Sequence, residues 1–347
     1  MQDVYSTRTN TLDSTYIQSE IRHIISELRK KGLIITSKAQ LKKSGSSAVD
    51  CTGLDSRSVL KKALKRQSYK ILKEIEDYDY KKGYKYSMMF RKVKAENFVG
   101  EHKAIIYKST SVDHIGKIIE KPTIRTVGDE TFIKFTQLMP NKNNPDEKRL
   151  YTIIVIINNS DGIVEFRFDQ VSDRFKVNDQ FYIQSVKKVK SWIEAKFDIR
   201  LKTLNFTYII DKIVNNNDEN IKVCYEDMIL ENNCRASFQA TENTLELPVI
   251  GDFQKIIQDH PAVFDEKSKA RKIIEEYIEK VYATSEFPKR GIRWLKEKKQ
   301  VMFIHNYKTG NDTLIHHYAE NNNKEMMDHV REYVIKHRKK VKRKQSN

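Results

Sequence analysis

The sequence predicts an α+β protein: a helical, basic N-terminal region followed by antiparallel hairpin-plus-helix units. Three observations support this prediction. Apolar residues recur at helical spacing in roughly the first eighty residues, paired segments rich in β-branched and aromatic residues follow from about residue 125, and a helical apolar stripe comes after each pair. No repeated sequence is visible, so the units share a format rather than a demonstrated duplication.

The first predicted helix covers residues 15–31, where isoleucine and leucine form one apolar stripe, and Gly32 supplies its C-terminal stop. A short apolar strand follows at once from Leu33. Residues 1–43 are therefore expected to form a helical segment. A recognition helix often enters the wing of a winged-helix domain in this way, and an ordinary helix end gives the same pattern.

Residues 44–57 are rich in small and polar residues, which predicts a linker. A second helix is predicted from Ser58 to Asp77, with an apolar face and an opposite face that is basic. The cations of the basic face are Lys62, Arg66, Lys70 and Lys73. Such a face can lie along a phosphate backbone. A solvated helix face is the plainer alternative, because Lys and Arg are good helix formers.

Aromatic and basic residues interleave between Asp77 and Lys94. This pattern is typical of surfaces that bind single-stranded nucleic acid, because bases stack on rings while cations hold phosphates. It makes Tyr84, Tyr86 and Arg91 candidate contact residues. The alternation of apolar residues from Tyr84 onward equally fits a strand whose aromatic face is buried. Together with the basic helix, this segment forms the predicted region 58–122.

Two α+β units are predicted in the rest of the chain. Residues 123–215 contain three successive strands and a helix from about 180 to 197. Residues 216–335 contain two hairpins, which turn near Asn232 and Gly310, and end in a C-terminal helix with one apolar side.

The net charge of +17 is distributed unevenly. Residues 1–100 carry +10 and residues 331–347 carry +7, while the middle sums to zero. Clustered positive charge is the usual mark of nucleic-acid binding, although an anionic membrane or an acidic protein would also fit. Residues 336–347 form a basic tail. Its candidate phosphate contacts are Lys339, Lys340, Lys342, Arg343 and Lys344.

Motifs for nucleotide, zinc or common hydrolase sites are missing, so no cofactor or metal is predicted. A metal-dependent nuclease would need carboxylates that hold Mg²⁺, and Asp161, Glu165 and Asp169 are the candidates. Arg167 stands where such a site has Lys. The alternative is an exposed strand face whose charges compensate one another.

A second group of weak catalytic candidates lies late in the chain. His305 and His316 are expected to face each other across the last hairpin, where two imidazoles could bind a metal or transfer protons. Tyr318 beside His316 is a candidate nucleophile for strand transfer, but the ordered basic motifs of such enzymes are not found. Packing residues are the plainer interpretation.

The sequence thus favours a DNA-binding protein rather than an enzyme. Its Asn- and Lys-rich composition indicates an AT-rich genome, and so a bacterial or mobile-element setting such as antiviral (phage) defence. A cytoplasmic location is expected, because no apolar stretch reaches 18 residues, no signal-peptide pattern is seen and the three cysteines form no framework. Two alternatives stay open: a nucleic-acid-processing enzyme, and an adaptor for an acidic protein. The neutral middle could also hold a protein partner or a second copy of the chain.

Overall fold

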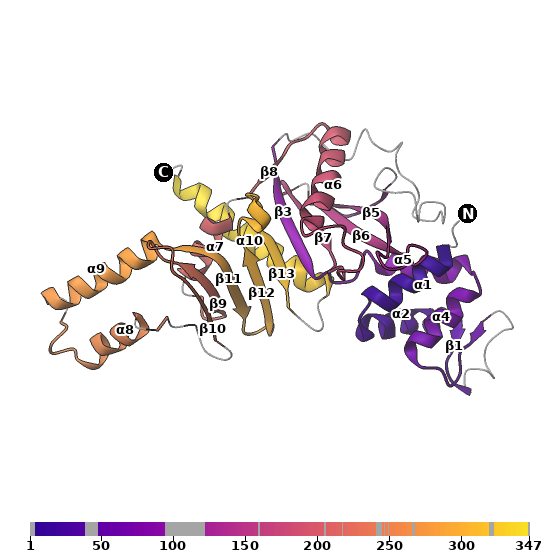
Figure 1. Cartoon of the computed structure of the whole chain (residues 1–347), viewed down its shortest axis with the longest axis horizontal. Coiled ribbons are helices and arrows are strands. Elements are labelled where there is room, and N and C mark those ends of the chain that lie inside the picture. Colours follow the sequence, from indigo (N-terminus) through magenta and orange to yellow (C-terminus); the bar gives the residue numbers. More distant parts are fainter. Residues whose placement is uncertain are drawn as a thin grey trace. The chain divides into compact units, whose positions relative to one another are not determined.

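The computed structural model describes residues 4–38, 48–93, 122–158, 160–204, 206–216, 218–240, 245, 247–248, 250–265, 268–318 and 323–345, of which 309 and 339–345 are described by their backbone alone. Helices and antiparallel strands are both abundant, which confirms the α+β class (Figure 1). The chain divides into two compact units: Met1–Leu204 with Glu320–His329, and Asn205–Ala319 with Val330–Asn347. Within these ranges no helix has the length and apolar character needed to cross a bilayer.

The N-terminal part of unit 1 is a helical layer around one apolar core, to which Leu28, Leu64 and Ile75 contribute fully buried side chains. Its elements are α1 (Val4–Thr15), α2 (Gln18–Lys30), β1 (Ile34–Ile35), β2 (Val49–Asp50), α4 (Ser56–Lys65) and α5 (Tyr69–Tyr78). Gly32, with a φ of +67°, ends α2 as predicted, since a left-handed residue there costs glycine little.

The helical layer differs from the prediction in three places. The helix α1 was not expected, because its Thr- and Ser-rich sequence has no apolar stripe. The predicted helix 58–77 is two helices, separated at Gln67, whose φ is +50°. Part of the expected linker is structured, since Val49 pairs with Ile34 and Cys51 is fully buried. The pairing of β1 with β2 is parallel, unlike the antiparallel hairpin of a wing.

The rest of unit 1 is an antiparallel sheet in the order β4-β5-β6-β7-β3-β8. Its strands are β3 (Tyr86–Lys92), β4 (Thr123–Val127), β5 (Glu130–Pro140), β6 (Lys148–Asn158), β7 (Ile163–Phe168) and β8 (Leu201–Thr203). Gly162, with a φ of +65°, makes the predicted tight turn between β6 and β7. The run of β-branched residues in β6 suits the centre of a buried sheet.

Helices cover both faces of this sheet. On one face α6 (Phe181–Phe197) packs through Trp192, whose ring lies 5.2 Å from that of Phe135. On the other face Met327, in the first turn of α10 (Lys324–Gln345), packs among Phe132 and Ile154. Every residue of β7 is therefore buried, and the predicted solvent-exposed face of this strand is wrong.

The strands of unit 2 pair antiparallel in the order β10-β9-β11-β12-β13, with helices against them. Its core holds Trp294 and Phe303, which contact the rings of Tyr333 and Phe206. Its elements are α7 (Phe206–Val214), β9 (Ile221–Ile229), β10 (Arg235–Gln239), α8 (Ile250–Asp259), α9 (Lys269–Thr284), β11 (Glu286–Trp294), β12 (Lys299–Ile304), the 3₁₀ turn η3 (Tyr307–Thr309), β13 (Leu314–His317) and the C-terminal part of α10.

Candidate functional site

The exposed side of α4 and α5 carries a group of basic residues outside the ion pairs that the structure describes. Lys62 and Lys65 are exposed on α4, Arg66 caps its C-terminus, Lys70 is exposed on α5 and Lys73 is half-buried. In the described part of the chain, none of these five cations lies within 4.0 Å of a carboxylate oxygen. None of the five is therefore held in an ion pair by a described residue, although Lys62 lies near enough to Asp50 to lower the pKa of that carboxyl, after the larger effect of the Asp50 hydrogen bonds to Thr52.

Two cations close to these helices do pair with acidic residues. Lys61 on α4 lies 2.7 Å from Asp13, and Lys31 after α2 lies 2.6 Å from Glu74. Because such exposed pairs contribute at most about 1 kcal/mol, they matter less for stability than for the local potential. The positive potential of this surface therefore comes mainly from the five cations named above.

The corner between α4 and α5 gathers three features that suit a phosphate. Arg66 and Lys70 flank it, and Tyr69 between them is 39% exposed. The first N–H groups of α5 start here, and the Ser68 side chain makes no capping bond to them. A helix N-terminus attracts anions through its free N–H groups and its dipole. The corner thus offers charge, hydrogen-bond donors and one aromatic ring.

The structure separates the other predicted contact residues. Tyr84 is only 2% exposed and its hydroxyl donates to the backbone oxygen of Asp79, so a role for its ring in base stacking is wrong. Tyr86 is half-buried and packs on Phe168 and Tyr182. Arg91 is half-buried on β3.

The helix α10 continues to Gln345, so the residues predicted as tail contacts are part of this helix. The side chains of Lys339, Lys340, Lys342, Arg343 and Lys344 lie outside the described residues. His337, which the sequence placed in the tail, is buried, and its ring lies 4.4 Å from that of Tyr333. The docked part of α10 therefore extends to this residue.

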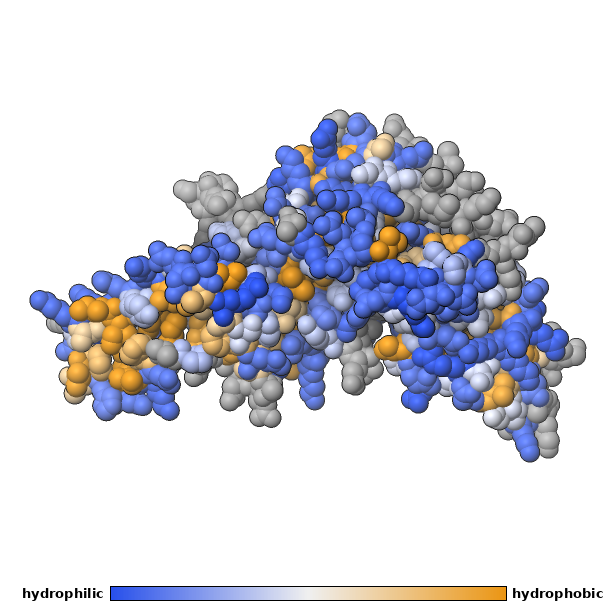
Figure 2. All heavy atoms as spheres, in the orientation of Figure 1, coloured by the Kyte–Doolittle hydropathy of each residue, from blue (hydrophilic) through white to orange (hydrophobic). Residues whose placement is uncertain are grey.

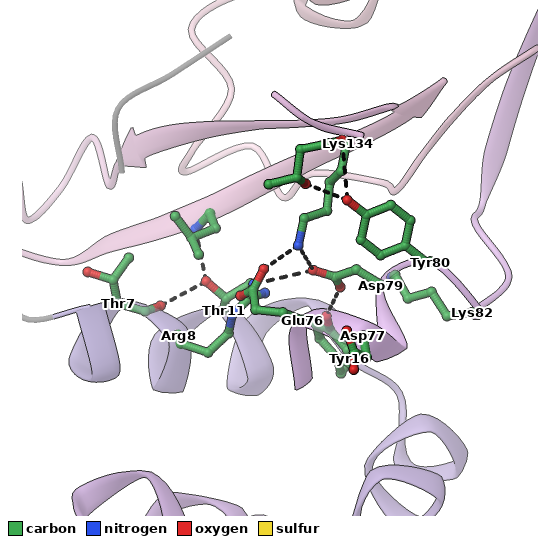
Figure 3. Close-up of polar contacts among 12 residues, drawn as sticks. Thr7, Arg8, Thr11, Tyr16, Glu76, Asp77, Asp79, Tyr80, Lys82 and Lys134 are labelled. Atoms are coloured by element: carbon green, nitrogen blue, oxygen red, sulfur yellow. Dashed lines mark hydrogen bonds and ion pairs between the residues drawn. The ribbon is translucent and has the colours of Figure 1, made fainter. Parts of the chain in front are cut away.

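A buried ionic network holds the helical layer against the sheet (Figure 3). Arg8 on α1 and Lys134 on β5 each pair with the carboxylates of Glu76 and Asp79 at the end of α5, with both Asp79 contacts at 3.3 Å. The Tyr16 hydroxyl also donates to Asp79. Burial by itself would raise the pKa of Asp79, but Arg8 and the nearby lysines hold it below its ordinary value.

A second cation, Lys82, extends this network to β7. It pairs with Asp169 and, at 3.7 Å, with Glu20 on α2, and its ammonium lies over the ring of Tyr16. Burial would lower the pKa of Lys82, but the surrounding carboxylates, Asp169 first, raise it above its ordinary value. Burial raises the pKa of Glu20, despite the opposing effect of Lys82.

Arg149 on β6 is a buried cation of a different kind. It is 1% exposed, stacks over Phe175 at 4.2 Å, and has no acidic oxygen within 4.0 Å in the described ranges. Burial lowers its pKa to about 10, so it stays protonated at neutral pH. It lines a narrow polar recess with Arg8, Tyr16, Tyr151 and others of the network.

The nuclease candidates do not converge. Asp161 accepts a hydrogen bond from the Ile163 N–H in the turn, and Asp169 pairs with Lys82 after the other end of β7. The six residues of β7, about 20 Å of extended strand, separate the two carboxylates. Glu165 between them is fully buried and pairs with Arg167, at 2.7 Å.

The Glu165 pair explains why an Arg occupies the Lys position of the nuclease pattern. Arg167 also binds Asp328 of α10 at 2.7 Å, so it bridges the strand to the helix that covers it. Over the described ranges, no three His, Cys, Asp or Glu side chains gather as a metal would require.

The late histidines also separate. His316 lies opposite Met302 in the β12–β13 register, and the Nδ1 of His305 lies 3.1 Å from the hydroxyl of Thr313. The predicted cross-strand pair of His305 and His316 is therefore wrong by register. The rings of His316 and Tyr318 do contact each other, with centroids 3.9 Å apart, and Tyr318 is 43% exposed.

Comparison with known proteins gives no further guidance. No protein-family model matches the chain, and no curated protein or solved structure shows significant similarity to it. The candidate site therefore depends on the chemistry of its own residues. Sequence reasoning found four of its five cations and missed Tyr69, since nothing in the pattern separates this exposed ring from a buried helix position.

Proposed function

We propose that the protein binds nucleic acid, with DNA as the favoured ligand, through the basic corner of α4 and α5. The observation that supports this proposal is a set of five cations that make no ion pair with any described residue: Lys62, Lys65, Arg66, Lys70 and Lys73. Phosphate contacts by such residues release condensed counterions, which makes binding strong at low salt and weak at high salt. Because nothing at this surface reads base edges in a recognisable motif, the proposed binding is largely sequence-independent.

The surrounding structure suits this role in two ways. The apolar core and the buried ionic network keep α4 and α5 in place, so that little conformational entropy is lost when the corner is occupied. Tyr69 adds a ring on which an unpaired base can stack, and such stacking is worth about 1–3 kcal/mol. The basic run of α10 provides a second segment of positive charge.

The test is a salt titration of the full chain on duplex DNA, single-stranded DNA and duplex RNA. If all five cations reach phosphates, the slope of log K on log salt should be about −4.5 for duplex DNA. The variant Arg66→Gln with Lys70→Gln should reduce the magnitude of the slope by about 2. The matched control is Lys31→Gln with Lys61→Gln, which removes the same charge from cations paired with acids.

Equal losses in the two double variants would mean that only net charge matters and would remove the corner from the proposal. Undetectable binding to all three ligands at physiological salt would favour the adaptor for an acidic protein. The tail is tested by a chain that ends at Arg338, which keeps the buried His337. A smaller slope for this chain would assign phosphate contacts to the basic run beyond it.

Three further expectations belong to this proposal. The setting is a bacterial or mobile-element system such as phage defence, which rests on composition alone. The location is the cytoplasm. The organisation is a basic helical region followed by hairpin-plus-helix units. Cleavage with Mg²⁺ is not proposed, since Glu165 is buried in an ion pair and the other two carboxylates lie apart.

A further inference from the structure

Exposed apolar side chains concentrate on the α8–α9 hairpin of unit 2. Of the 14 large apolar residues that are exposed in the described ranges, five lie here: Ile256, Val263, Ile273, Tyr277 and Tyr282. Figure 2 shows orange, apolar atoms over α8 and α9. Singly scattered apolar residues are normal on protein surfaces, whereas a cluster marks an interaction site.

Apolar side chains lie on two sides of the hairpin. Its inner side is already occupied, because Ile250 and Ile278 pack with Met228 in a small core against the sheet. Ile273 lies outside this core and is 66% exposed, and Tyr277 beside it is 54% exposed. A surface helix normally places charged and polar residues opposite its buried stripe, so the second apolar side has no role within this unit.

Two residues of opposite charge lie on this outer side of α9. Lys269 and Glu276 are exposed, seven residues apart and on the same side of α9 as Ile273, which lies between them. Seven residues are two turns, or about 10.5 Å along the axis. Neither charge has an ion-pair partner in the described ranges.

We propose that a second copy of this chain docks on α9, with the two α9 helices antiparallel around a two-fold axis at Ile273. Ile273 then packs on the partner's Ile273. Lys269 lies near Glu276 of the partner subunit, and Glu276 lies near the partner's Lys269, so each pair forms twice. A parallel arrangement would place like charges together, which costs free energy.

The area available predicts how strong this dimer is. The 16 residues of α9 span about 24 Å, and a helix face about 10 Å wide buries roughly 240 Å² on each subunit. This area is well below the roughly 800 Å² per partner of a standard stable interface. The proposed dimer is therefore weak and reversible, and micromolar dissociation constants are the range to test.

The experiment is analytical ultracentrifugation of the full chain from about 1 to 200 μM, a range that brackets a micromolar constant. The average mass should rise from 40.9 kDa toward twice that value. Ile273→Glu should weaken the dimer at least tenfold. The matched control is Val177→Glu, which changes a 75% exposed valine of unit 1 and should leave the dimer unchanged.

Charge reversal tests the arrangement itself. Lys269→Glu alone and Glu276→Lys alone should each weaken the dimer, because each places like charges together twice. The double variant should restore it. A second apolar variant, Tyr277→Ser, guards against a folding defect in Ile273→Glu, and circular dichroism compares all variants with the parent.

A chain that stays monomeric at 200 μM would overturn the proposal and leave the apolar side to a different protein. Dimers unaffected by Ile273→Glu and Tyr277→Ser would also overturn it, as would a double variant no better than the single ones. None of these residues belongs to the proposed nucleic-acid corner. Failure of dimerisation and failure of nucleic-acid binding are therefore separate results.

Discussion

Replacing Arg8 with Met should destabilise unit 1 strongly, because it breaks the centre of the buried network. The guanidinium binds both Glu76 and Asp79, and in its absence two carboxylates must share Lys134. Both carboxylates stay largely out of solvent, with side-chain exposures of 12% and 1%. Met keeps the apolar stem, so the variant removes mainly the charge and its hydrogen bonds.

The expected loss is about 3–5 kcal/mol, the range for breaking one partner of a buried ion pair. This is a large fraction of the roughly 5–15 kcal/mol by which a typical domain is stable. The difference in unfolding free energy between the parent and Arg8→Met should become smaller at acidic pH. The network holds the pKa of Asp79 below its ordinary value. The ionised Asp79 therefore stabilises the folded state above the ordinary pKa, and this stabilisation is lost as the pH falls through the lowered pKa.

The assay is urea unfolding followed by the fluorescence of Trp192, in a background that carries Trp294→Phe. The chain has only two tryptophans, and Trp192 lies on α6 of unit 1, so its signal reports that unit. The matched variant is Arg149→Met, which removes an equally buried guanidinium without a carboxylate partner. It should cost nothing, or even stabilise by up to about 2 kcal/mol, because an unpaired buried charge is unfavourable. Equal losses in the two variants would refute the reasoning.

Three further predictions follow from single residues. Burial, assisted by Arg290, lowers the pKa of His305 to about 4, so the free energy of unfolding of unit 2 should fall by up to about 3 kcal/mol between pH 6.5 and pH 4. His305→Phe should remove most of this pH dependence in urea unfolding followed by the fluorescence of Trp294. A Cβ at Gly291 would lie 2.8 Å from that of Tyr225, so Gly291→Ala should cost about 1–3 kcal/mol in the same assay, and an unchanged midpoint would contradict the close approach of β9 and β11. Tyr69→Ala should weaken binding to single-stranded DNA by about 1–3 kcal/mol, as measured by fluorescence anisotropy, while duplex binding changes little; equal losses would argue against base stacking.

The elements that the sequence predicted well are those with a strong local signal. The apolar stripe of α2, the β-branched run of β6 and the turn at Gly162 all combine pattern with suitable end residues. The helix α1 has no such signal. Its buried side includes Thr7, Arg8 and Thr11. Arg8 and Thr11 bind partners far away in the sequence, the Glu76 carboxylate and the Leu150 N–H.

Errors at the candidate site have the same physical origin. Tyr84 and Glu165 lie in segments whose alternation was read correctly, but a polar or aromatic residue on a strand faces solvent only if nothing covers that side of the sheet. In this chain the first turn of α10 covers it, and the first residues of α10 lie more than 150 positions after Glu165. Lys62, Arg66 and Lys70 are exposed as predicted, because the spacing of apolar residues within each helix marks the side that is buried.

Charge composition becomes informative about function only after the paired charges are set apart. Arg8, Lys82 and Lys134 count toward the basic character of the sequence. Each is buried in an ion pair with a carboxylate and cannot contact a ligand at the surface. Lys31 and Lys61 are exposed but compensated. The cations of the helical layer that make no ion pair with a described residue include those at the α4–α5 corner. A polyanion would bind to these unpaired cations, whatever the net charge of the whole chain. For this reason the comparison of two double variants with identical net charge, one at the corner and one at the paired lysines, separates a binding site from a merely basic protein.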